Sequence, residues 1–481
     1  MIIKSDYKSY LACPRQYALD QQGTLKPDEP YIVKRRYAQG EKVGEFAHTW
    51  FEDVYKIDTD QSLKDRVSDT QKALKKADVI AEASFIYEDA FCAVDILERT
   101  ATGWNIYEVK SKTKIESEMV DDAAYQVYIA LNSGLEIDHV YLLHVNKHYV
   151  RENVVDVREY FVLEDITSKV TSRIPKVSPT LEAMKAVTEI PEFVPVGACN
   201  ECPFKSHCYD SLPEDSMVKL YDYKKKTKKY LEGARTLQDM LVFEPKLSDI
   251  QRRQIAYHYD ESLPAYINHA SLDKFVSQIT YPIHYLDFET LDFVWPPFPH
   301  TAPNEKLPYQ ASLHVEATPN EDLKHYEFLT EPPKDPRLSM IHFLISHIHS
   351  EGSIIVYHKT FEKGVLEVLA ERYPKYQQEL LSMVDRIIDL KDPFAQGMIY
   401  ARDMAGSFSI KNVYPAMVPE KRTAYKDLIN IHNGTDAMMG LENLQTSKPD
   451  EKSTLKEHLL AYCKLDTLSM VEILDKIRII L

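Results

Sequence analysis

Acidic residues occur at two places where their spacing suits metal-assisted hydrolysis of a phosphodiester. In the first third of the chain, Asp95 is followed by the Glu-Val-Lys triplet at 108–110. In the last two fifths, the Asp-Phe-Glu triplet at 287–289 is followed much later by Tyr462 and Asp466. Cleaving a phosphodiester requires carboxylates that hold divalent metal ions against the phosphate and the attacking water. The sequence therefore favours hydrolysis of nucleic acid.

The first set is expected on a β-hairpin. Side chains at i and i+2 of a strand share one face, so Glu108 and Lys110 point the same way and Val109 turns into the core. Asp95 ends the preceding apolar strand, and pairing brings it beside Glu108. The two carboxylates can hold Mg²⁺ or Mn²⁺, Lys110 can orient the attacking water, and His48, on a helix expected at 38–55, can add a ligand. The alternative is an exposed strand with an ordinary Glu–Lys pair.

The second set is expected on a strand and a late helix. Asp287 and Glu289 share one face of a strand at 283–290, and two adjacent carboxylates are costly without a cation. Tyr462 and Asp466 are four residues apart on a helix expected at 455–480, so the tyrosine hydroxyl can orient a metal-bound water beside the aspartate. A surface strand end and a chance helical pair are the alternatives.

Four of the six cysteines form a third pattern. Cys199, Cys202 and Cys208 are closely spaced, and Cys13 lies far upstream. Four thiolates suit a [4Fe–4S] cluster or a structural Zn²⁺. The remaining two, Cys92 and Cys463, are expected to be small buried apolar residues.

Composition limits the partners and the compartment. The net charge of −16 argues against a broad coat of nucleic acid but allows a narrow basic channel. Basic runs at 34–36 and 224–229 are either solvated helix faces or phosphate-contacting surfaces. The start of the chain has no signal-peptide pattern, and no apolar stretch approaches the ~20 residues of a membrane helix. We therefore expect a cytoplasmic protein with reduced cysteines and no membrane partner.

These residues must be positioned by an α/β protein of several parts. Residues 1–210 are expected to form one α/β domain, with strands at 80–86, 90–97, 104–110 and 140–145 and helices at 121–132 and 175–190. Residues 211–280 have the pattern of a helical connector. A second α/β domain is expected at 281–481, with strands at 283–290, 307–317 and 354–358 and a helix at 360–372. The proline-rich segment 292–308 is expected to be a loop.

The order of motifs in the first domain resembles the PD-(D/E)xK nuclease superfamily. It is most similar to the RecB-like branch that includes the CRISPR-associated iron–sulfur exonucleases. The matching positions are Gly44, His48, Asp95, Glu108, Lys110 and Gln126, with the four cysteines divided as one before and three after the nuclease core. The resemblance implies metal binding by His48, Asp95 and Glu108, DNA contact by Gln126, and a [4Fe–4S] cluster on Cys13, Cys199, Cys202 and Cys208. A tyrosine usual four residues after the glutamine is replaced by Ala130.

The last domain resembles the DnaQ-like (DEDD) exonuclease superfamily, which has an RNase H-like fold. The third acid would be Glu362 in place of the usual aspartate, with Asp389 as a possible substitute. Because Ala461 stands where one subclass has a histidine, Tyr462 indicates the tyrosine subclass. This half of the chain is also similar to an uncharacterised bacterial domain family that is often fused to RecB-like nucleases.

Together the resemblances imply a two-site, metal-dependent DNA exonuclease that acts on single strands or DNA ends, with the second site working 3′ to 5′. One alternative has a single active site and a second domain that only binds nucleic acid. Another is a non-catalytic subunit that grips DNA ends, and RNA is also a possible substrate. Repair, phage defence and CRISPR adaptation are all compatible pathways.

Overall fold

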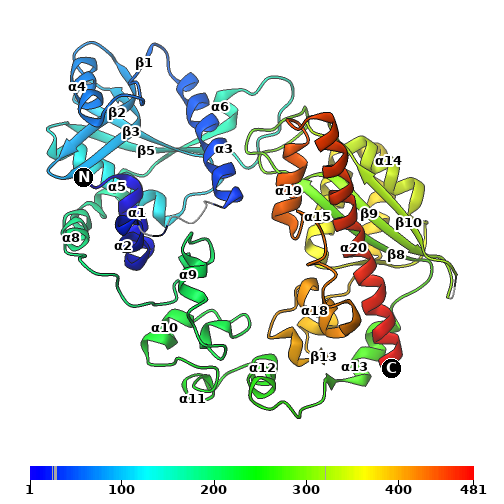
Figure 1. The fold of residues 1–481 in the computed structure, drawn as a ribbon. Helices are drawn as coiled ribbons and strands as arrows, with labels where there is room; N and C mark the ends of the chain where they lie inside the picture. Colours follow the sequence, from blue (N-terminus) through cyan, green and yellow to red (C-terminus); the bar gives the residue numbers. More distant parts are fainter. Residues whose placement is uncertain (24, 26–29, 320) are drawn as a thin grey trace. The chain divides into compact units, whose positions relative to one another are not determined.

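The structure, a computed structural model, describes all residues except 24, 26–29 and 320. The chain is mixed α/β and divides into two compact units (Figure 1). Unit 1 consists of Met1–Leu212 with Phe293–Glu305, and unit 2 of Pro213–Asp292 with Lys306–Leu481. The segment expected to be a helical connector, 211–280, therefore belongs to unit 2 from Pro213 onwards.

A curled six-stranded sheet forms the centre of unit 1. Its strands follow the chain order β1 (Val54–Lys56), β2 (Val79–Tyr87), β3 (Ala90–Arg99), β4 (Trp104–Lys110), β5 (Ile137–Val145) and β6 (Phe161–Asp165). Strands β2, β3 and β4 form an antiparallel meander, whereas β4 and β5 are parallel and are joined by helix α5 (Ser117–Asn132). The expected strands at 80–86, 90–97, 104–110 and 140–145 are confirmed.

The two faces of this sheet are covered by different helices. Helices α1 (Lys4–Ala12), α4 (Leu63–Ala73), α5 and α8 (Ile174–Lys185) pack on the face that carries Ile106 and Leu142. Helix α3 (Tyr31–Ala47) packs on the opposite face, where Val43 and Ala47 contact the cluster around Tyr107 and Leu143. Alternating apolar residues along each strand account for both cores.

One expected helix of unit 1 has the wrong bounds. The helix expected at 38–55 begins at Tyr31 and ends at Ala47, a short turn η1 (His48–Trp50) follows, and β1 begins at Val54. Phe46, Trp50 and Phe51 have helical spacing, but only Phe46 lies in the helix, and Trp50 and Phe51 contact the core after the chain has left it. Asp53, with φ of 50°, adopts a left-handed conformation that no continuous helix permits.

Unit 2 is built on a five-stranded sheet with the order β10-β9-β8-β11-β12. The strands are β8 (Ile283–Leu291), β9 (Leu307–Glu316), β10 (Lys324–Leu329), β11 (Ile354–Val356) and β12 (Ile387–Asp389). Strands β8, β9 and β10 are antiparallel neighbours, whereas β11 is parallel to β8 and to β12. The strands expected at 283–290, 307–317 and 354–358 are thus confirmed, the last in shorter form.

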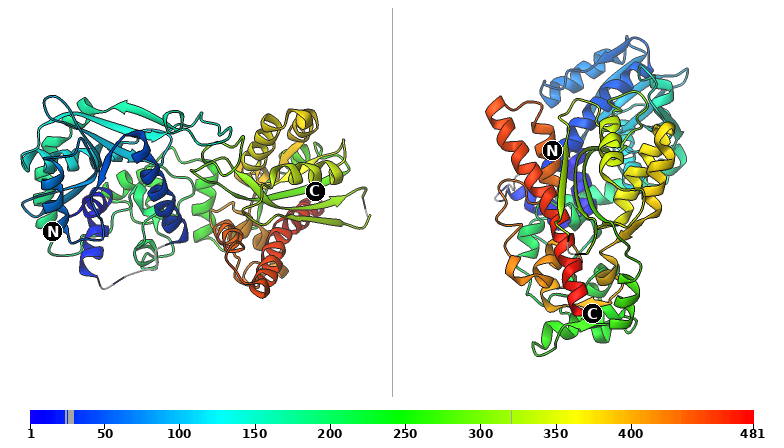
Figure 2. Two further views of the ribbon diagram at one scale, coloured as in Figure 1. Left: turned by 90° about the horizontal axis from the view of Figure 1, so that it is seen from above. Right: turned by 90° about the vertical axis from the view of Figure 1, so that its right-hand side faces the viewer.

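Helices lie on both faces of the second sheet (Figure 2). Helices α14 (Arg337–His347) and α15 (Lys359–Arg372) cover the face of Leu286 and Phe288. The long helix α20 (Pro449–Ile480) covers the opposite face, where its Met470 and Leu474 join the core of Tyr285. Phe288 is 2% exposed and points away from α20, so Asp287 and Glu289 on either side of it point toward that helix.

The remaining helices of unit 2 are short. Between Pro213 and β8 lie α10 (Lys226–Leu231), α11 (Met240–Phe243), α12 (Asp249–Tyr259) and α13 (His269–Val276); α16 (Gln377–Asp385), α18 (Ile410–Met417) and α19 (Gly434–Asn443) come later. A two-stranded sheet pairs β13 (Ile399–Tyr400) with β7 (Tyr266–Ile267). None of the helices in the described part of the chain is long and apolar enough to cross a membrane.

The proline-rich segment is a loop, as expected, but most of it belongs to unit 1. The ring of Trp295 packs edge-on against Phe46 with 4.5 Å between ring centroids. The guanidinium of Arg151 donates hydrogen bonds to the carbonyls of Pro296 and Pro297, at 2.9 and 2.8 Å. Residues 293–305 therefore complete the core of unit 1 from a distant part of the chain.

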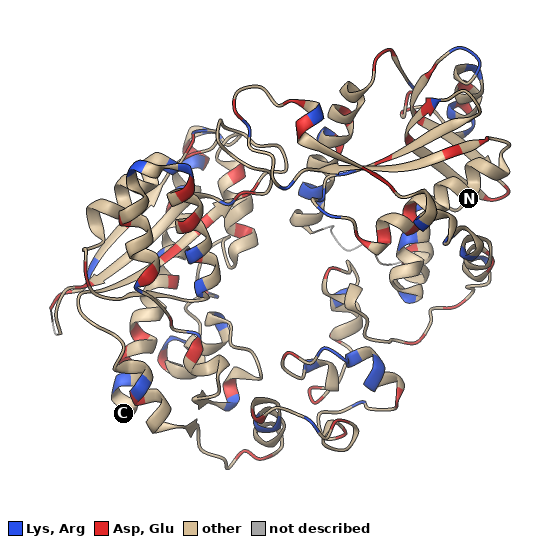
Figure 3. Cartoon of the chain, turned by 180° about the vertical axis from the view of Figure 1, so that it is seen from behind, with Lys and Arg blue, Asp and Glu red and all other residues tan. Residues whose placement is uncertain are grey.

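Charged residues of both signs are interspersed over both units (Figure 3). In the basic run 224–229, Lys224 pairs with Asp222, Lys225 with Glu244, and both Lys228 and Lys229 with Glu232. These pairs favour the interpretation of this run as a charge-balanced surface.

Candidate functional site

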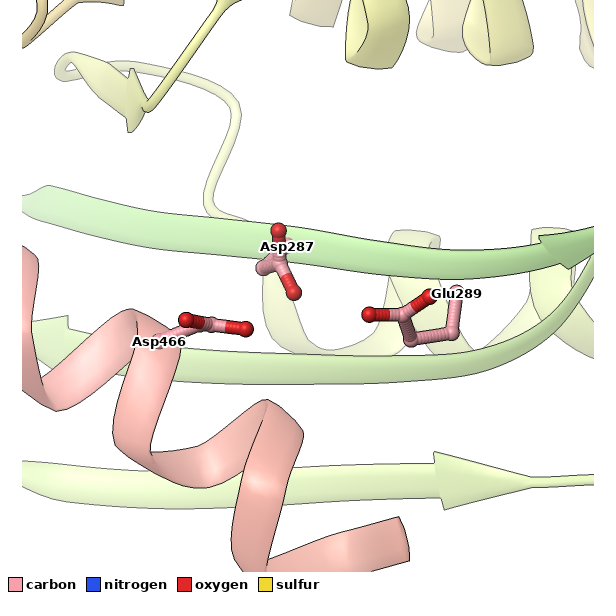
Figure 4. Close-up of side chains that lie close together, drawn as sticks. All are labelled: Asp287, Glu289 and Asp466. Atoms are coloured by element: carbon pink, nitrogen blue, oxygen red, sulfur yellow. The ribbon is translucent and has the colours of Figure 1, made fainter. Parts of the chain in front are cut away.

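Three carboxylates meet between β8 and α20 in unit 2 (Figure 4). Asp287 and Glu289 project from the strand, and Asp466 faces them from the helix. Their ligand oxygens all lie within 4.8 Å of one another, and no other set of three or more His, Cys, Asp or Glu side chains in the described residues meets this condition. Oxygens at this spacing suit Mg²⁺ or Mn²⁺, which bind oxygen ligands at about 2.1 Å.

Glu362 adds a fourth acid beside this group. It lies in the first turn of α15, is 2% exposed, and one of its buried carboxylate oxygens, Oε2, has no hydrogen-bond partner. Burial, and then the charge of Asp287, raise the pKa of Glu362 to about 9. Burial also raises the pKa values of Asp287, Glu289 and Asp466, with the neighbouring acids adding to the shifts of Asp287 and Glu289. A bound divalent cation would relieve this unfavourable concentration of acids.

These shifts predict a pH dependence for the metal-free protein. Glu362 binds its proton more tightly in the folded state, because its pKa is about 9 there and 4.5 without the fold. The contribution of Glu362 to the free energy of unfolding is therefore greatest below pH about 4.5 and is lost as the pH rises toward about 9. Thermal unfolding in EDTA should show this fall, and saturating Mn²⁺ should reduce it. Glu362→Gln should flatten the EDTA profile, and an unchanged profile in this variant would contradict the assignment.

Further polar side chains surround the acids. Lys411 of α18 donates a hydrogen bond to the Tyr462 hydroxyl at 3.2 Å, and Tyr425 donates to Asp466 Oδ1 at 2.6 Å. The thiol of Cys463 lies 3.3 Å from Asp287 Oδ2. Asp287, Glu289, Asp466, Tyr462 and Lys411 all line one cavity of about 290 Å³. Cys463 is buried, as expected, but beside a candidate ligand rather than among apolar groups alone.

Asp389, a possible substitute for Glu362, has a different role in the structure. Its two carboxylate oxygens accept hydrogen bonds from the backbone N–H groups of His358, Lys359 and Lys391, at 2.9 to 3.0 Å. His358 has a φ of 94°, which is strained for a residue with a side chain. Asp389 therefore fixes the backbone at the start of α15, and through it the position of Glu362.

The first acidic set lies on the face of the unit 1 sheet that α1 and α5 cover. Asp95 lies within β3, four residues before its end, and not at the strand end as expected. Its Oδ2 accepts a hydrogen bond from the backbone N–H of Val109 at 2.7 Å, which holds it beside Glu108. Glu108 itself is fully buried. Burial and the charge of Glu108 raise the pKa of Asp95.

Three side chains bind the carboxylate of Glu108. Lys110 lies 2.6 Å from its Oε1 and Lys4 lies 3.2 Å from the same oxygen, while the Gln126 amide donates to Oε2. Although burial opposes ionisation, the two ammonium groups and this amide lower the pKa of Glu108. Gln126, for which the resemblance implies DNA contact, is fully buried, so its observed role is to hold Glu108.

A cavity of about 700 Å³ opens over Asp95. His48 lines it, and burial lowers the pKa of its imidazole, which favours the neutral form that can bind a metal. Glu82 also lines it, from the β2 position between Ala81 and Ala83, which pair with Ile96 and Val94 on either side of Asp95. Six basic side chains share the lining: Lys4, Lys8, Arg36, Lys56, Lys110 and Lys112.

The four cysteines of the third pattern surround one small cavity of unit 1. Cys13 lies between α1 and α2 (Pro14–Gln22), Cys199 lies in the turn η2 (Gly197–Asn200), and Cys208 lies in α9 (Lys205–Tyr209). Arg15 donates a hydrogen bond to the sulfur of Cys208 at 3.4 Å. Burial raises the pKa of Cys202 to about 11. Cys13 thus lines the same cavity as Cys199, Cys202 and Cys208 although it lies far from them in the sequence.

The sulfur spacing bears on which group the cysteines can hold. A tetrahedral Zn²⁺ with Zn–S bonds of about 2.3 Å requires thiolates about 3.8 Å apart. No three cysteine sulfurs of the described residues lie within 4.8 Å of one another. In this arrangement the sulfurs are therefore not spaced for a single tetrahedral Zn²⁺ ion.

Several neighbours of the two sites were not predicted from the sequence. Lys4 reaches Glu108 across 104 positions, and Asp122 lies 3.0 Å from the Lys110 ammonium. Tyr425 reaches Asp466 from an irregular segment. Of these, only Asp122 had a usable signal, because it precedes Gln126 by four residues and so shares its helix face.

Comparisons with known proteins assign no activity. A family model described as "Domain of unknown function (DUF2779)" matches residues 284–409, which include Asp287, Glu289 and Glu362 but not Asp466. A search of curated protein sequences finds no match. A solved structure described as "Crystal structure of SSO0001" is 10% identical, with 41% of this chain and 96% of that chain covered and a TM-score of 0.20. A TM-score this low carries no conclusion about the fold.

Proposed function

We propose that the protein is a metal-dependent nuclease with two hydrolytic sites, most similar in action to exodeoxyribonucleases. The observation that carries the proposal is the gathering of Asp287, Glu289 and Asp466 within 4.8 Å, beside the buried unpartnered oxygen of Glu362. Four acids at this density are unfavourable unless cations bind between them, and two cations on four carboxylates suit an in-line attack on a phosphodiester.

In the second site each residue has a distinct task. Asp287, Glu289, Glu362 and Asp466 would hold Mg²⁺ or Mn²⁺, and the metal would supply Lewis acidity to the phosphate. Tyr462 lies one helical turn from Asp466 and is held by Lys411, so its hydroxyl can orient the attacking water. The strand order β10-β9-β8-β11-β12 is compatible with the RNase H-like fold of DnaQ-like exonucleases, which implies 3′ to 5′ action.

In the first site, Asp95 and Glu108 would hold a metal ion with help from His48, and Lys110 would orient water. This part of the proposal is supported by the parallel β4-α5-β5 unit, which is compatible with a PD-(D/E)xK core, and by the basic lining of the cavity. Six basic side chains at one cavity offer phosphate contacts in a chain whose net charge is −16. Such local attraction favours DNA ends or single strands over a long duplex.

A second candidate keeps catalysis in unit 2 alone. In unit 1 both oxygens of Glu108 are already bound by protein groups, and the acids of this unit that the structure describes do not form a compact triad. This difference between the acidic groups of the two units favours the hypothesis that unit 1 binds nucleic acid and unit 2 cleaves it.

Digestion of end-labelled single-stranded DNA with Mn²⁺ separates these candidates. Wild type, Lys110→Ala, Asp466→Ala and the double variant would be compared, with RNA as a second substrate. Two active sites require that each single variant lose a distinct product ladder and that the double variant be inert. If Asp466→Ala alone is inert and Lys110→Ala cleaves like wild type, unit 1 is a binding module. If wild type cleaves neither DNA nor RNA, the nuclease proposal fails.

The cysteine set is proposed to hold a [4Fe–4S] cluster on Cys13, Cys199, Cys202 and Cys208, which would close a long loop between the two ends of unit 1. Anaerobically purified wild type is expected to be brown with broad visible absorbance, and Cys13→Ser is expected to lose that colour and to melt at lower temperature. Cys92→Ala, a buried cysteine outside the set, is the control and should stay brown. A colourless wild type that contains zinc would reject the iron–sulfur assignment.

A further inference from the structure

The oxygens of the first site that remain for a metal ion are limited by their other contacts. Asp95 Oδ2 accepts from the backbone of Val109, and Glu108 Oε2 accepts from Gln126. This leaves Asp95 Oδ1, on a side chain that lines the cavity, and Glu108 Oε1, whose partners are the ammonium groups of Lys4 and Lys110. The ammonium of Lys4 lies 3.8 Å from the first of these oxygens and 3.2 Å from the second.

Lys4 differs in this respect from the other lysine of the site. Lys110 contacts Glu108 Oε1 and Asp122, but no ion pair joins it to Asp95 in the described residues. Among the lysines and arginines that the structure describes, only Lys4 forms ion pairs with both Asp95 and Glu108. Its ammonium therefore lies where a cation bridging the two carboxylates would have to bind.

The backbone around Lys4 is held in place on both sides. Ile2 forms a parallel bridge with Ala90 at the start of β3, through hydrogen bonds of 2.7 Å to the Asp89 carbonyl and 2.9 Å from the Phe91 N–H. One turn after Lys4, the ring of Tyr7 packs on Tyr125 with 4.7 Å between centroids. The far end of α1 runs into Cys13 of the cysteine set. The backbone of Lys4 is therefore fixed beside Asp95 and Glu108, and only the Lys4 side chain is free to move.

We propose that Lys4 is an internal counter-cation of the first site, which competes with a divalent metal ion for Asp95 and Glu108. A metal ion that binds Asp95 Oδ1 and Glu108 Oε1 must displace the ammonium, because two cations cannot occupy the same space between the carboxylates. The Lys4 side chain is 30% exposed and lines the cavity, so the displaced ammonium has room to move toward solvent. Lys4 thus sets how much metal the first site requires before it is loaded.

This inference rests on the proposed metal site of unit 1, and metal binding tests it without any measurement of cleavage. The full-length protein would carry Asp287→Asn and Asp466→Asn to silence the second site, and free Mn²⁺ would be followed by its EPR signal. In this background Lys4→Gln is expected to tighten Mn²⁺ binding by roughly tenfold. Lys4→Arg, which keeps the charge, should leave the affinity near that of the background.

The matched control is Lys8→Gln. Lys8 lies on the same helix one turn later, but it pairs with Asp122 at 3.4 Å and not with Asp95 or Glu108. Its replacement should change Mn²⁺ affinity by less than about twofold. Circular dichroism establishes that each variant is folded, and Lys4→Ala replaces Lys4→Gln if the latter is not.

The outcomes separate the two proposals. Tighter binding in Lys4→Gln that Asp95→Asn abolishes supports the role of Lys4. Equal or weaker binding in Lys4→Gln overturns it while leaving the metal site intact. Binding in none of the variants overturns both the role of Lys4 and the proposed metal site of unit 1.

Discussion

Replacing Asp287 by asparagine is expected to lower the rate of the exonuclease reaction proposed for the second site by at least about a thousandfold. Asp287 lies at the centre of the acidic group, where Glu289, Asp466 and Glu362 all face it. An amide supplies no charge for a metal ion, so metal affinity and cleavage should fall together. The rate is measured as release of the 3′-terminal nucleotide in a Lys110→Ala background, which removes the contribution of the first site.

The same substitution is expected to stabilise the protein when metal is absent. Burial and the neighbouring Asp466 charge raise the pKa of Asp287, so its ionised form is unfavourable in the fold. Asparagine does not ionise and avoids this penalty, so it should raise the free energy of unfolding in EDTA by on the order of 1 kcal/mol at neutral pH. Asp287 would then lower the stability of the metal-free protein while supporting its activity, which is typical of functional-site residues.

Asp389→Asn is the matched control for this prediction. Asp389 lies on β12 near the same site, but its oxygens accept three backbone hydrogen bonds. An asparagine presents an amide nitrogen to at least one of those N–H donors, so stability should fall by about 2 kcal/mol. If Asp287→Asn destabilises the metal-free protein as Asp389→Asn does, Asp287 is a structural residue and the metal-site interpretation is wrong.

At the first site, Lys110→Met is expected to have the largest effect on folding stability. Lys110 neutralises two buried carboxylates, with 2.6 Å to Glu108 and 3.0 Å to Asp122. Removing one partner of a buried ion pair leaves an uncompensated charge and costs about 3 to 5 kcal/mol. The product ladder of the first site should also disappear. Chemical denaturation measures the first effect and end-labelled DNA the second.

Two further variants separate the structural effect from the catalytic one. Lys112→Met removes a lysine two positions along that is 47% exposed and pairs with Glu116 and Glu118, so stability should change by less than about 1 kcal/mol. Lys110→Met combined with Glu108→Gln removes both charges and should recover part of the lost stability without recovering cleavage. Recovered cleavage in the double variant would exclude Lys110 and Glu108 from the chemistry.

The sequence predicted the local part of both sites and missed the part that depends on long-range contacts. Alternation on one strand placed Asp287 and Glu289 on the same face, and helical spacing placed Tyr462 beside Asp466; both placements follow from a single element. The helix expected at 38–55 was wrong because apolar residues at helical spacing continue past Ala47 while the chain itself turns.

Contacts between distant elements had no such signal. Lys4 and Glu108 are 104 positions apart, and nothing in the residues around Lys4 distinguishes it from the exposed lysines of other helices. For Asp389 the sequence signal was ambiguous, because an aspartate at the end of a buried strand suits either metal binding or backbone capping. Only the three N–H groups that point at it decide between these roles.

The loop of residues 293–305 has a consequence for how the protein can be synthesised and dissected. Leu212 is synthesised well before Trp295. During translation, Phe46 and Tyr160 therefore lack the Trp295 ring that they contact in the complete chain. A protein fragment that ends at Leu212 would expose the apolar surface around Phe46 and Tyr160, and such exposed surfaces promote aggregation. Expression of unit 1 by itself should therefore succeed better when residues 293–305 are joined to it through a flexible linker than when the chain is simply truncated at Leu212.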